Sequence, residues 1–255
     1  MNFFLIFLER MSFVKTFLGK RFLNLLKNNL PNLRLITRKR RNGLKTCLGP
    51  DNASYRFFFT SFKSGLIDKF FQDLKEIDYF IDIGANVGWY SLCAAGSSKC
   101  HVLSIEPNPN TFITLLTNIK INNLSHRITV INAAISSNNH NVTITNLNSA
   151  DQNFVEFNNP NGIKVIPLKL DEVVSKVPKN KNIAIKIDVE GLEDDVIFSG
   201  ESSISNIKEI KLIYCEIVIP KINIINKFLN ENGFMCIESV PNKGGNCVNN
   251  KYIRK

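Results

Sequence analysis

A strand, a glycine-containing turn and a helix follow one another within Tyr79–Ser91, and this stretch limits the possible folds more than any other. Tyr79–Ile83 is a short apolar run with aromatic and β-branched residues, which is typical of a buried strand. The turn after it is built from small residues: Gly84, Ala85, Asn86 and Gly88. An apolar, helix-like stretch then begins at Trp89. The order indicates the start of a nucleotide-binding βαβ unit, in which glycines let the backbone approach a ligand closely.

The next segment continues this unit. His101–Glu106 is a second short apolar strand that ends in a carboxylate, 24 residues after Asp82. An acidic residue at this position can bind both hydroxyl groups of a ribose. Asn108 is predicted to cap the following helix, with Pro109 as its first residue.

The residues of the turn bear on which nucleotide it would bind. Asn86 stands where a dinucleotide site would have a second loop glycine, and Asp82 lies just before the turn. A carboxylate there would repel a diphosphate and attract a cationic ligand. S-adenosylmethionine carries a sulfonium and an ammonium group and no phosphate, so the charge favours it over NAD. The predicted cofactor-binding residues are Asp82, Gly84, Ala85, Asn86, Gly88, Glu106, Asn108 and, from the loop after a third strand, Ala134.

Three motifs make the chain similar to a known family. Asp-Ile-Gly-Ala-Asn-Val-Gly (82–88), Ile-Glu-Pro-Asn-Pro (105–109) and Lys-Ile-Asp-Val-Glu-Gly (186–191) occur in the same order as in the FkbM family of S-adenosylmethionine-dependent methyltransferases. The resemblance covers roughly residues 64–255. It implies O-methylation of a hydroxyl on a small molecule or sugar, with S-adenosylmethionine as the cofactor.

The predicted fold is α/β, that of a Rossmann-like class I methyltransferase. We expect a mostly parallel seven-stranded sheet with an antiparallel last strand and an inserted β-hairpin before strand four. The seven core strands are predicted at Tyr79–Ile83, His101–Glu106, Ile128–Ile135, Ile183–Ile187, Ile210–Glu216, Phe234–Val240 and Val248–Arg254. The two strands of the insert are predicted at Val142–Leu147 and Ile163–Leu168, around a polar loop.

Lys186, Asp188 and Glu190 are the predicted catalytic residues. They lie at or just after the carboxyl end of strand four, which should neighbour strand one at the edge where ligands bind. On an extended chain the three would project to the same side. Other interpretations remain open: Glu190 as a carboxylate favoured by a helix N-terminus, Asp188 as a structural contact, and Glu216 as a further site residue. No metal ligand is predicted, although a carboxylate pair could hold a divalent ion.

The positive charge is confined to the N-terminal part. The whole chain has a net charge of +10, and residues 1–45 contain 11 Lys and Arg against one acid, so the remainder is neutral. We therefore predict residues 1–63 as a basic, apolar extension and 64–255 as the methyltransferase domain. A neutral catalytic part makes nucleic acid an unlikely partner. Residues 1–41 could instead form an amphipathic helix that contacts an anionic membrane surface peripherally or packs on the domain; a mitochondrial presequence is a further option.

The cysteines indicate the compartment. The chain has six, none in a Cys-x-x-Cys pair, so we expect a reducing, cytoplasmic location, with membrane association as an option.

Two other functions remain as alternatives. An NAD-linked oxidoreductase or epimerase would need the missing GxGxxG loop and Tyr-x-x-x-Lys pair, and a non-catalytic Rossmann-like binding module would keep the fold alone.

Overall fold

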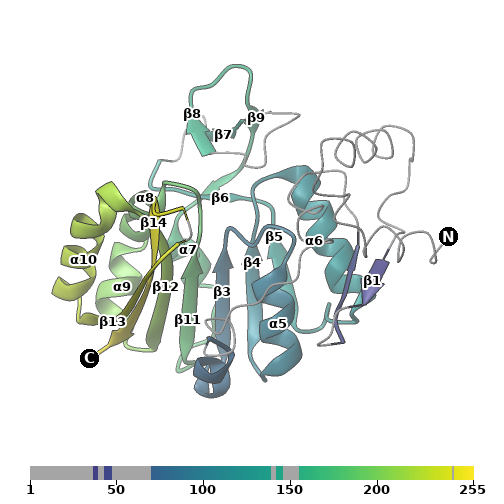
Figure 1. Ribbon diagram of the computed structural model, residues 1–255, viewed down its shortest axis with the longest axis horizontal. Coiled ribbons are helices and arrows are strands. Elements are labelled where there is room, and N and C mark those ends of the chain that lie inside the picture. Colours follow the sequence, from purple (N-terminus) through teal and green to yellow (C-terminus); the bar gives the residue numbers. More distant parts are fainter. Residues whose placement is uncertain (1–36, 40–42, 48–69, 139–141, 146–154, 243) are drawn as a thin grey trace.

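The computed structural model describes residues 37–39, 43–47, 70–138, 142–145, 155–242 and 244–255 (Figure 1). Most of the predicted N-terminal extension, including nearly all of its predicted helix, lies outside these residues. Within the described part of the chain, no helix combines the length and apolar character needed to cross a bilayer.

A seven-stranded sheet forms the centre, in the spatial order β5–β4–β3–β11–β12–β14–β13 (Figure 1). Its strands are β3 (Tyr79–Ile83), β4 (His101–Ile105), β5 (Ile128–Ile131), β11 (Ile183–Ile187), β12 (Ile210–Val218), β13 (Phe234–Pro241) and β14 (Cys247–Arg254). The strands from β5 to β12 in this order are mutually parallel, and β14 alone runs antiparallel to both of its neighbours. The predicted sheet, with its antiparallel last strand, is confirmed.

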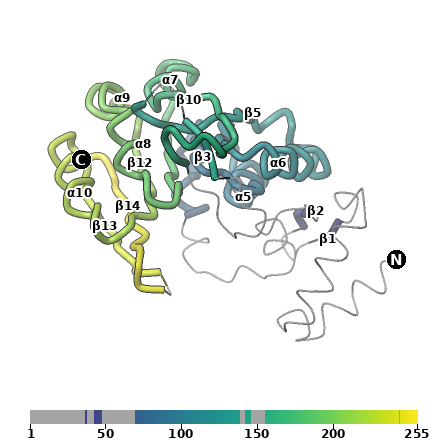
Figure 2. Tube along the Cα trace, turned by 90° about the horizontal axis from the view of Figure 1, so that it is seen from above, coloured from purple at the N-terminus to yellow at the C-terminus, as the bar shows by residue number. Residues whose placement is uncertain are grey.

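Helices cover both faces of the sheet (Figure 2). One face carries α5 (Trp89–Ser97), α6 (Pro109–Ile121) and the 3-10 turn η3 (Leu74–Glu76), which follows helical residues 70–73. The other face carries α7 (Leu170–Val174), α8 (Glu193–Phe198), α9 (Glu201–Asn206) and α10 (Ile222–Glu231), the last preceded by η4 (Ile219–Lys221). The result is a three-layer sandwich.

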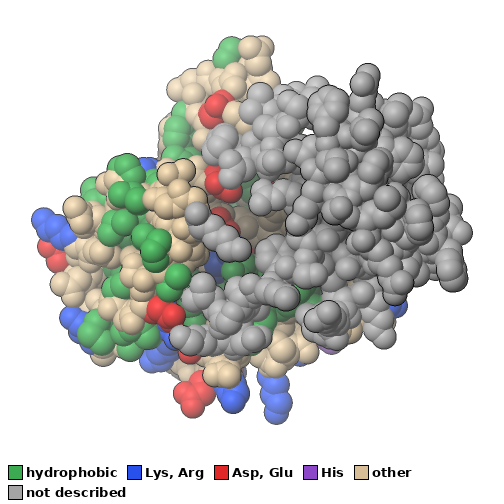
Figure 3. Space-filling model, viewed as in Figure 1, with side chains coloured by type: hydrophobic (Ala, Val, Ile, Leu, Met, Phe, Trp, Pro, Cys, Tyr) green, Lys and Arg blue, Asp and Glu red, His purple; other side chains and the backbone are tan. Residues whose placement is uncertain are grey.

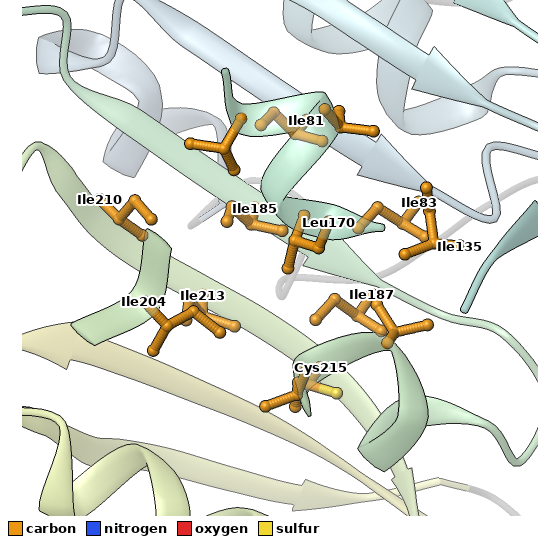
Figure 4. Close-up of a cluster of buried hydrophobic side chains, with 14 of the residues drawn as sticks. Ile81, Ile83, Ile135, Leu170, Ile185, Ile187, Ile204, Ile210, Ile213 and Cys215 are labelled. Atoms are coloured by element: carbon orange, nitrogen blue, oxygen red, sulfur yellow. The ribbon is translucent and has the colours of Figure 1, made fainter. Parts of the chain in front are cut away.

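Successive side chains of β11 point to opposite faces of the sheet. Ile185 and Ile187 face the helices α7 to α10, together with Ile81 and Ile83 of β3 (Figure 4). The residues between them face the opposite way, so Lys186 points to the layer that contains α5. A lysine inside a buried strand is costly unless it is paired with an acid.

The insert before β11 contains the predicted strand pairing and one strand more. β7 (Val142–Ile144) pairs antiparallel with β9 (Ile163–Lys164), and β8 (Val155–Phe157) pairs with the other edge of β7. This three-stranded sheet lies above the carboxyl ends of the central strands in Figure 1. The predicted strand Ile163–Leu168 divides, because after β9 the chain leaves β7, and β10 (Pro167–Leu168) pairs with β6 (Ala134–Ile135). The predicted third strand divides in the same way, into β5 and β6.

A short hairpin packs against α6 from within the predicted extension. It consists of β1 (Thr37–Lys39) and β2 (Lys45–Cys47), paired antiparallel. The side chains of Thr46 and Cys47 are fully buried. Part of the segment assigned to the extension therefore contacts the folded domain directly.

Candidate active site

The turn after β3 can be formed only with glycine at its first position. Gly84 has a φ of +73°, and a Cβ built there would lie 1.9 Å from the carbonyl oxygen of Asp188. Gly88, which caps the N-terminus of α5, has a φ of +92°. Asn86 between them also adopts a left-handed conformation, with a φ of +51°, which asparagine tolerates better than most residues. The small residues noted in the sequence thus bring β3 close to the end of β11.

All five backbone N–H groups of residues 84–88 donate to acceptors within the protein. Those of Gly84 and Ala85 donate to the Ile105 carbonyl at 3.1 and 2.9 Å. The N–H of Asn86 donates to Glu106 Oε2 at 2.8 Å. The N–H of Val87 donates to Asn86 Oδ1 at 2.8 Å. The N–H of Gly88 donates to the Ala85 carbonyl at 2.9 Å. A phosphate-binding turn needs such groups free, and here they are occupied.

Glu106 connects the turn to the start of α6. While its Oε2 holds Asn86, its Oε1 accepts the N–H of Asn108 at 2.9 Å. The Asn108 side chain in turn accepts from the N–H groups of Asn110 and Thr111, so the predicted helix cap is confirmed. The residue after the third strand adds support, since Asn132 Nδ2 donates to the Glu106 carbonyl at 2.7 Å. An acidic residue that ends the second strand of such a βαβ unit is the group that binds ribose hydroxyls in nucleotide-binding folds.

Asp82, Lys186 and Asp188 form a connected charge cluster beneath and beside the turn. Lys186 Nζ lies 3.3 Å from Asp82 Oδ1 and 3.3 Å from Asp188 Oδ2. Asp82 is fully buried and also accepts a hydrogen bond from Ser91 Oγ at 2.5 Å. Burial alone would lower the pKa of Lys186, but the carboxylates of Asp188 and Asp82 outweigh it and hold that pKa above its ordinary value.

This arrangement corrects the expectation for Asp82. Its carboxylate does not face a ligand, because it is buried and its charge is balanced by Lys186. The two residues are directly opposite in the β3–β11 register. The argument that Asp82 itself repels a diphosphate therefore fails, and discrimination against phosphate has to come from the occupied N–H groups of the turn. The Asp188 side chain remains one-third exposed.

A cavity of about 270 Å³ opens beside Lys186 and Asp188, at the carboxyl ends of β11 and β12. Its aromatic walls come from Phe70, Tyr90 and Tyr214, and the Lys186 ammonium lies 4.9 Å from the centre of the Tyr90 ring. Ile187 and Cys215 also line it, and its polar groups come largely from β12, β13 and β14: Glu216, Glu238, Asn242, Asn249, Asn250 and Lys251. A compartment with ring faces, carboxylates and amides suits a small polar molecule.

Among the side chains that line this cavity, Glu216 is the carboxyl group whose pKa is raised toward neutral pH. Lys186 and Tyr214 are paired in the β11–β12 register. Asp188 lies two residues beyond Lys186, and Glu216 lies two residues beyond Tyr214, within β12, so both carboxylates line the cavity. Burial and the nearby carboxylates of Asp188 and Glu190 raise the pKa of Glu216 to about 7. Within the described part of the chain, no lysine or arginine forms an ion pair with Glu216. Its Oε1 accepts a hydrogen bond from Asn242 Nδ2 at 3.5 Å.

Two predicted site residues lie apart from this cluster. The shared orientation expected for Glu190 does not hold, because β11 ends at Ile187 and Glu190, with a φ of +56°, is exposed. Its charge still acts on Glu216. Ala134 is buried, and its N–H donates to the Ile166 carbonyl at 2.9 Å in the β6–β10 pair.

Two aromatic residues that line the cavity, Tyr90 and Tyr214, were not predicted as site residues from the sequence. Tyr90 lay within an apolar helical stretch, and Tyr214 within a predicted strand, so both fitted the core. Tyr214 in fact lines the cavity and donates a hydrogen bond to Asp73, which also pairs with Lys251. The shared parity of Tyr214 with Glu216 was the signal that could have placed it at the site.

Comparison with known proteins identifies a family whose model matches this chain. The family model described as "Methyltransferase FkbM domain" matches residues 82–236, which include the turn, Glu106, Lys186, Asp188 and Glu216. No curated protein matches the sequence.

Solved structures with a similar fold include three methyltransferases. The precorrin-6y C5,15-methyltransferase from Geobacter metallireducens is 14% identical, with 76% of this chain and 91% of that chain covered and a TM-score of 0.47. A putative rRNA methylase from Clostridium thermocellum is 9% identical, with 76% and 98% covered and a TM-score of 0.49. TrmK from M. capricolum, solved with S-adenosylhomocysteine, is 10% identical, with 76% and 70% covered and a TM-score of 0.47. Identities and TM-scores this low do not say what the present chain binds.

Proposed function

Since this chain belongs to the FkbM methyltransferase domain family, we propose that it transfers the methyl group of S-adenosylmethionine to a hydroxyl of a small molecule or carbohydrate. Its methyl donor is S-adenosylmethionine. When bound, this cofactor supplies an electrophilic methyl group on a positively charged sulfur. The protein has to hold the acceptor oxygen in line with that methyl group and remove the hydroxyl proton.

The observation that carries the proposal is the hydrogen-bonded turn between Gly84 and Gly88. All five of its backbone N–H groups donate within the protein, so none is available for a phosphate. The carboxylate of Glu106 lies at the end of the second strand beside the turn, the position from which an acidic residue binds ribose hydroxyls. A Cβ at Gly84 would close the approach between β3 and β11. These features fit a nucleoside without phosphates. We assign donor binding to the turn residues, Glu106, Asn108 and, near the adenine, Ala134.

The charge cluster supports a role for Lys186 and Asp188 on the acceptor side. Lys186 is held by Asp82 from below, and it holds Asp188 at the rim of the cavity. Asp188 can therefore accept a hydrogen bond from the acceptor in a fixed orientation. Glu216, across the same cavity, is the better proton acceptor, because a carboxyl with a pKa of about 7 combines ionisation at neutral pH with useful basicity. Glu190 acts in this scheme through its charge, which helps to raise the pKa of Glu216.

The acidic side chains that line the cavity favour a small, uncharged or cationic acceptor molecule over nucleic acid. Asp188, Glu216 and Glu238 line the cavity, and Lys186 and Lys251 are both paired with acids. Acidic side chains also gather above the central strands on the face shown in Figure 3. A polyphosphate backbone would be repelled there.

Methyl transfer from labelled S-adenosylmethionine into fractionated cell extract, followed by mass spectrometry, tests this function. The Asp188→Asn variant should bind S-adenosylhomocysteine normally and transfer label at least tenfold more slowly, the size expected for a lost positioning contact. A fully active variant would remove Asp188 from the mechanism. Label found mainly in RNA would replace the small acceptor with a nucleic acid.

The remaining proposals concern location. The excess positive charge in residues 1–45 supports peripheral membrane contact through residues 1–41. The cysteine pattern supports a cytoplasmic protein. If the first proposal is right, full-length protein sediments with anionic liposomes and a chain lacking residues 1–41 does not. Full-length protein that stays in the supernatant would contradict it.

A further inference from the structure

We infer that Asn118 is a positioning residue that couples the N-terminal hairpin to the cofactor turn, so that donor affinity depends on the docked hairpin. The inference rests on the proposed function, in which residues 84–88 bind the methyl donor. It gives a role to a segment that the sequence separates from the catalytic domain.

One buried amide makes both contacts. Asn118 lies on α6 and is fully buried. Its Oδ1 accepts the N–H of Cys47, the last residue of β2, at 2.7 Å. Its Nδ2 donates to the carbonyl oxygen of Val87, in the turn, at 2.9 Å. A primary amide has a donor end and an acceptor end, so a side chain without one of these groups cannot keep both contacts.

The contact to Val87 is made where the turn is least favourable on its own. Val87 lies between Asn86 and Gly88, both in the left-handed region. Glycine adopts this conformation without steric cost, but for Asn86 it costs free energy that contacts around the turn offset. Glu106 holds the N–H of Asn86, and Asn118 holds the carbonyl of the next residue. Losing the second contact leaves a buried carbonyl without this donor and loosens the turn.

The same face of α6 supports both partners through further contacts. One turn before Asn118, the Thr114 carbonyl accepts from Cys47 Sγ at 3.9 Å. Beside it, Leu115 packs under Gly88, where an added Cβ would lie 2.4 Å from Leu115 Cδ1. The helix is therefore in contact with the hairpin and the turn at once, and Asn118 is the polar connection between them.

A matched control lies one turn further along α6. Asn122 accepts the N–H of Lys45 and donates to the Lys45 carbonyl, both at 2.7 Å, so it also holds the hairpin. Asn122 Nδ2 also donates to the Asn118 carbonyl at 2.7 Å. Asn122→Ala removes only contacts to Lys45 and leaves Asn118 joined to both Cys47 and Val87, so the hairpin stays docked, whereas Asn118→Ala removes both of the contacts that join the hairpin to the turn.

The coupling must be reciprocal. If the docked hairpin strengthens donor binding through Asn118, then donor binding strengthens hairpin docking by the same factor. Two independent measurements therefore report on it: affinity for S-adenosylhomocysteine, and protection of the Lys45 and Cys47 amides from hydrogen exchange.

The experiment measures both in the full-length chain, with thermal unfolding of each variant in parallel. We expect Asn118→Ala to weaken S-adenosylhomocysteine binding by about tenfold, the loss typical of one buried hydrogen bond. Asn122→Ala should change affinity less than about threefold, even if its melting temperature falls as far. In the wild type, S-adenosylhomocysteine should slow exchange of peptides containing Lys45 and Cys47, and in Asn118→Ala this slowing should disappear.

Equal affinities for the Asn118→Ala and wild-type proteins would overturn the inference. If Asn118→Ala does not fold, the wild-type exchange data decide: a turn peptide protected by ligand, with no change at residues 45–47, contradicts the coupling. Wild-type protein that binds no S-adenosylhomocysteine would overturn the proposed function and this inference with it.

Discussion

At the scale of single residues, Glu106 holds two parts of the proposed donor site. Its carboxylate accepts the N–H of Asn86 in the turn and the N–H of Asn108 at the start of α6, and we propose that it also binds the ribose. Glu106→Ala should therefore weaken S-adenosylhomocysteine binding by at least tenfold in calorimetry, because two backbone N–H groups lose their acceptor and the ribose contacts disappear. Glu106→Gln, which keeps one oxygen, should lose less. Unchanged affinity in both variants would contradict the assignment of Glu106.

Glu216 gives a prediction with a defined pH window. Burial and the Asp188 and Glu190 carboxylates raise its pKa from 4.5 to about 7 in the folded protein. The folded state therefore binds this proton more tightly than the unfolded chain, and wild-type stability falls as the pH rises from about 4.5 to about 7. Glutamine does not ionise, so Glu216→Gln should be more stable than wild type at pH 8, by on the order of 1–3 kcal/mol.

Denaturant unfolding at pH 4 and pH 8 tests this directly. At pH 4 the two proteins should have nearly equal free energies of unfolding, because Glu216 is then protonated in the folded state. The same variant should transfer methyl groups slowly at every pH. A stability difference that is equal at both pH values would show that Glu216 does not titrate in this window.

Asp82 shows what could not be read from the sequence at this scale. Its position before the turn was correct, but its burial and its partner were not predictable. Lys186 lies 104 residues away in the chain and meets Asp82 only because β3 and β11 pair in register. The carboxylate thus supports the site from below instead of facing the ligand.

At the scale of elements, β11 contributes to both the core and the site, because its successive side chains point to opposite faces of the sheet. Its isoleucines enter the layer of α7 to α10, and Lys186 and Asp188 point to the cavity. Lys186→Met should destabilise the protein by about 3–5 kcal/mol, since it leaves the fully buried Asp82 without its cation. Asp82→Asn in the same background should recover part of this loss.

A surface pair provides the control for that experiment. Lys181 and Asp78 lie 3.2 Å apart, but their side chains are 46% and 40% exposed. Lys181→Met should cost at most about 1 kcal/mol in the same unfolding assay. Equal losses for the two methionine variants would show that the Lys186 cluster is not a buried ion pair in solution.

Element boundaries explain where sequence analysis succeeded and failed. The strands of the central sheet were predictable because each is a short apolar run followed by turn residues. In the insert, the pairing of β7 with β9 was predictable, but β8 was not, because it is short and lies within a predicted polar loop. Glu190 was misplaced for a related reason: the parity argument required β11 to continue beyond Ile187.

At the scale of the whole molecule, the strand order brings the parts of the site together. β3 lies between β4 and β11, so the turn, Glu106 and Asp188 meet at one edge, and β12 and β14 extend that edge into the cavity. This much followed from the motif order. The docking of β1 and β2 on α6 did not, since a basic, apolar N-terminal stretch gives no periodic signal for a hairpin that pairs with asparagine side chains.

The central claim is that the turn of residues 84–88 binds a nucleoside without phosphate groups, because its own N–H groups are occupied. Isothermal titration of the purified full-length protein with S-adenosylmethionine, S-adenosylhomocysteine and NAD tests it most directly. The account predicts binding of the two sulfur-containing ligands and no detectable heat from NAD under the same conditions. Binding of NAD, with none of either S-adenosyl ligand, would contradict it.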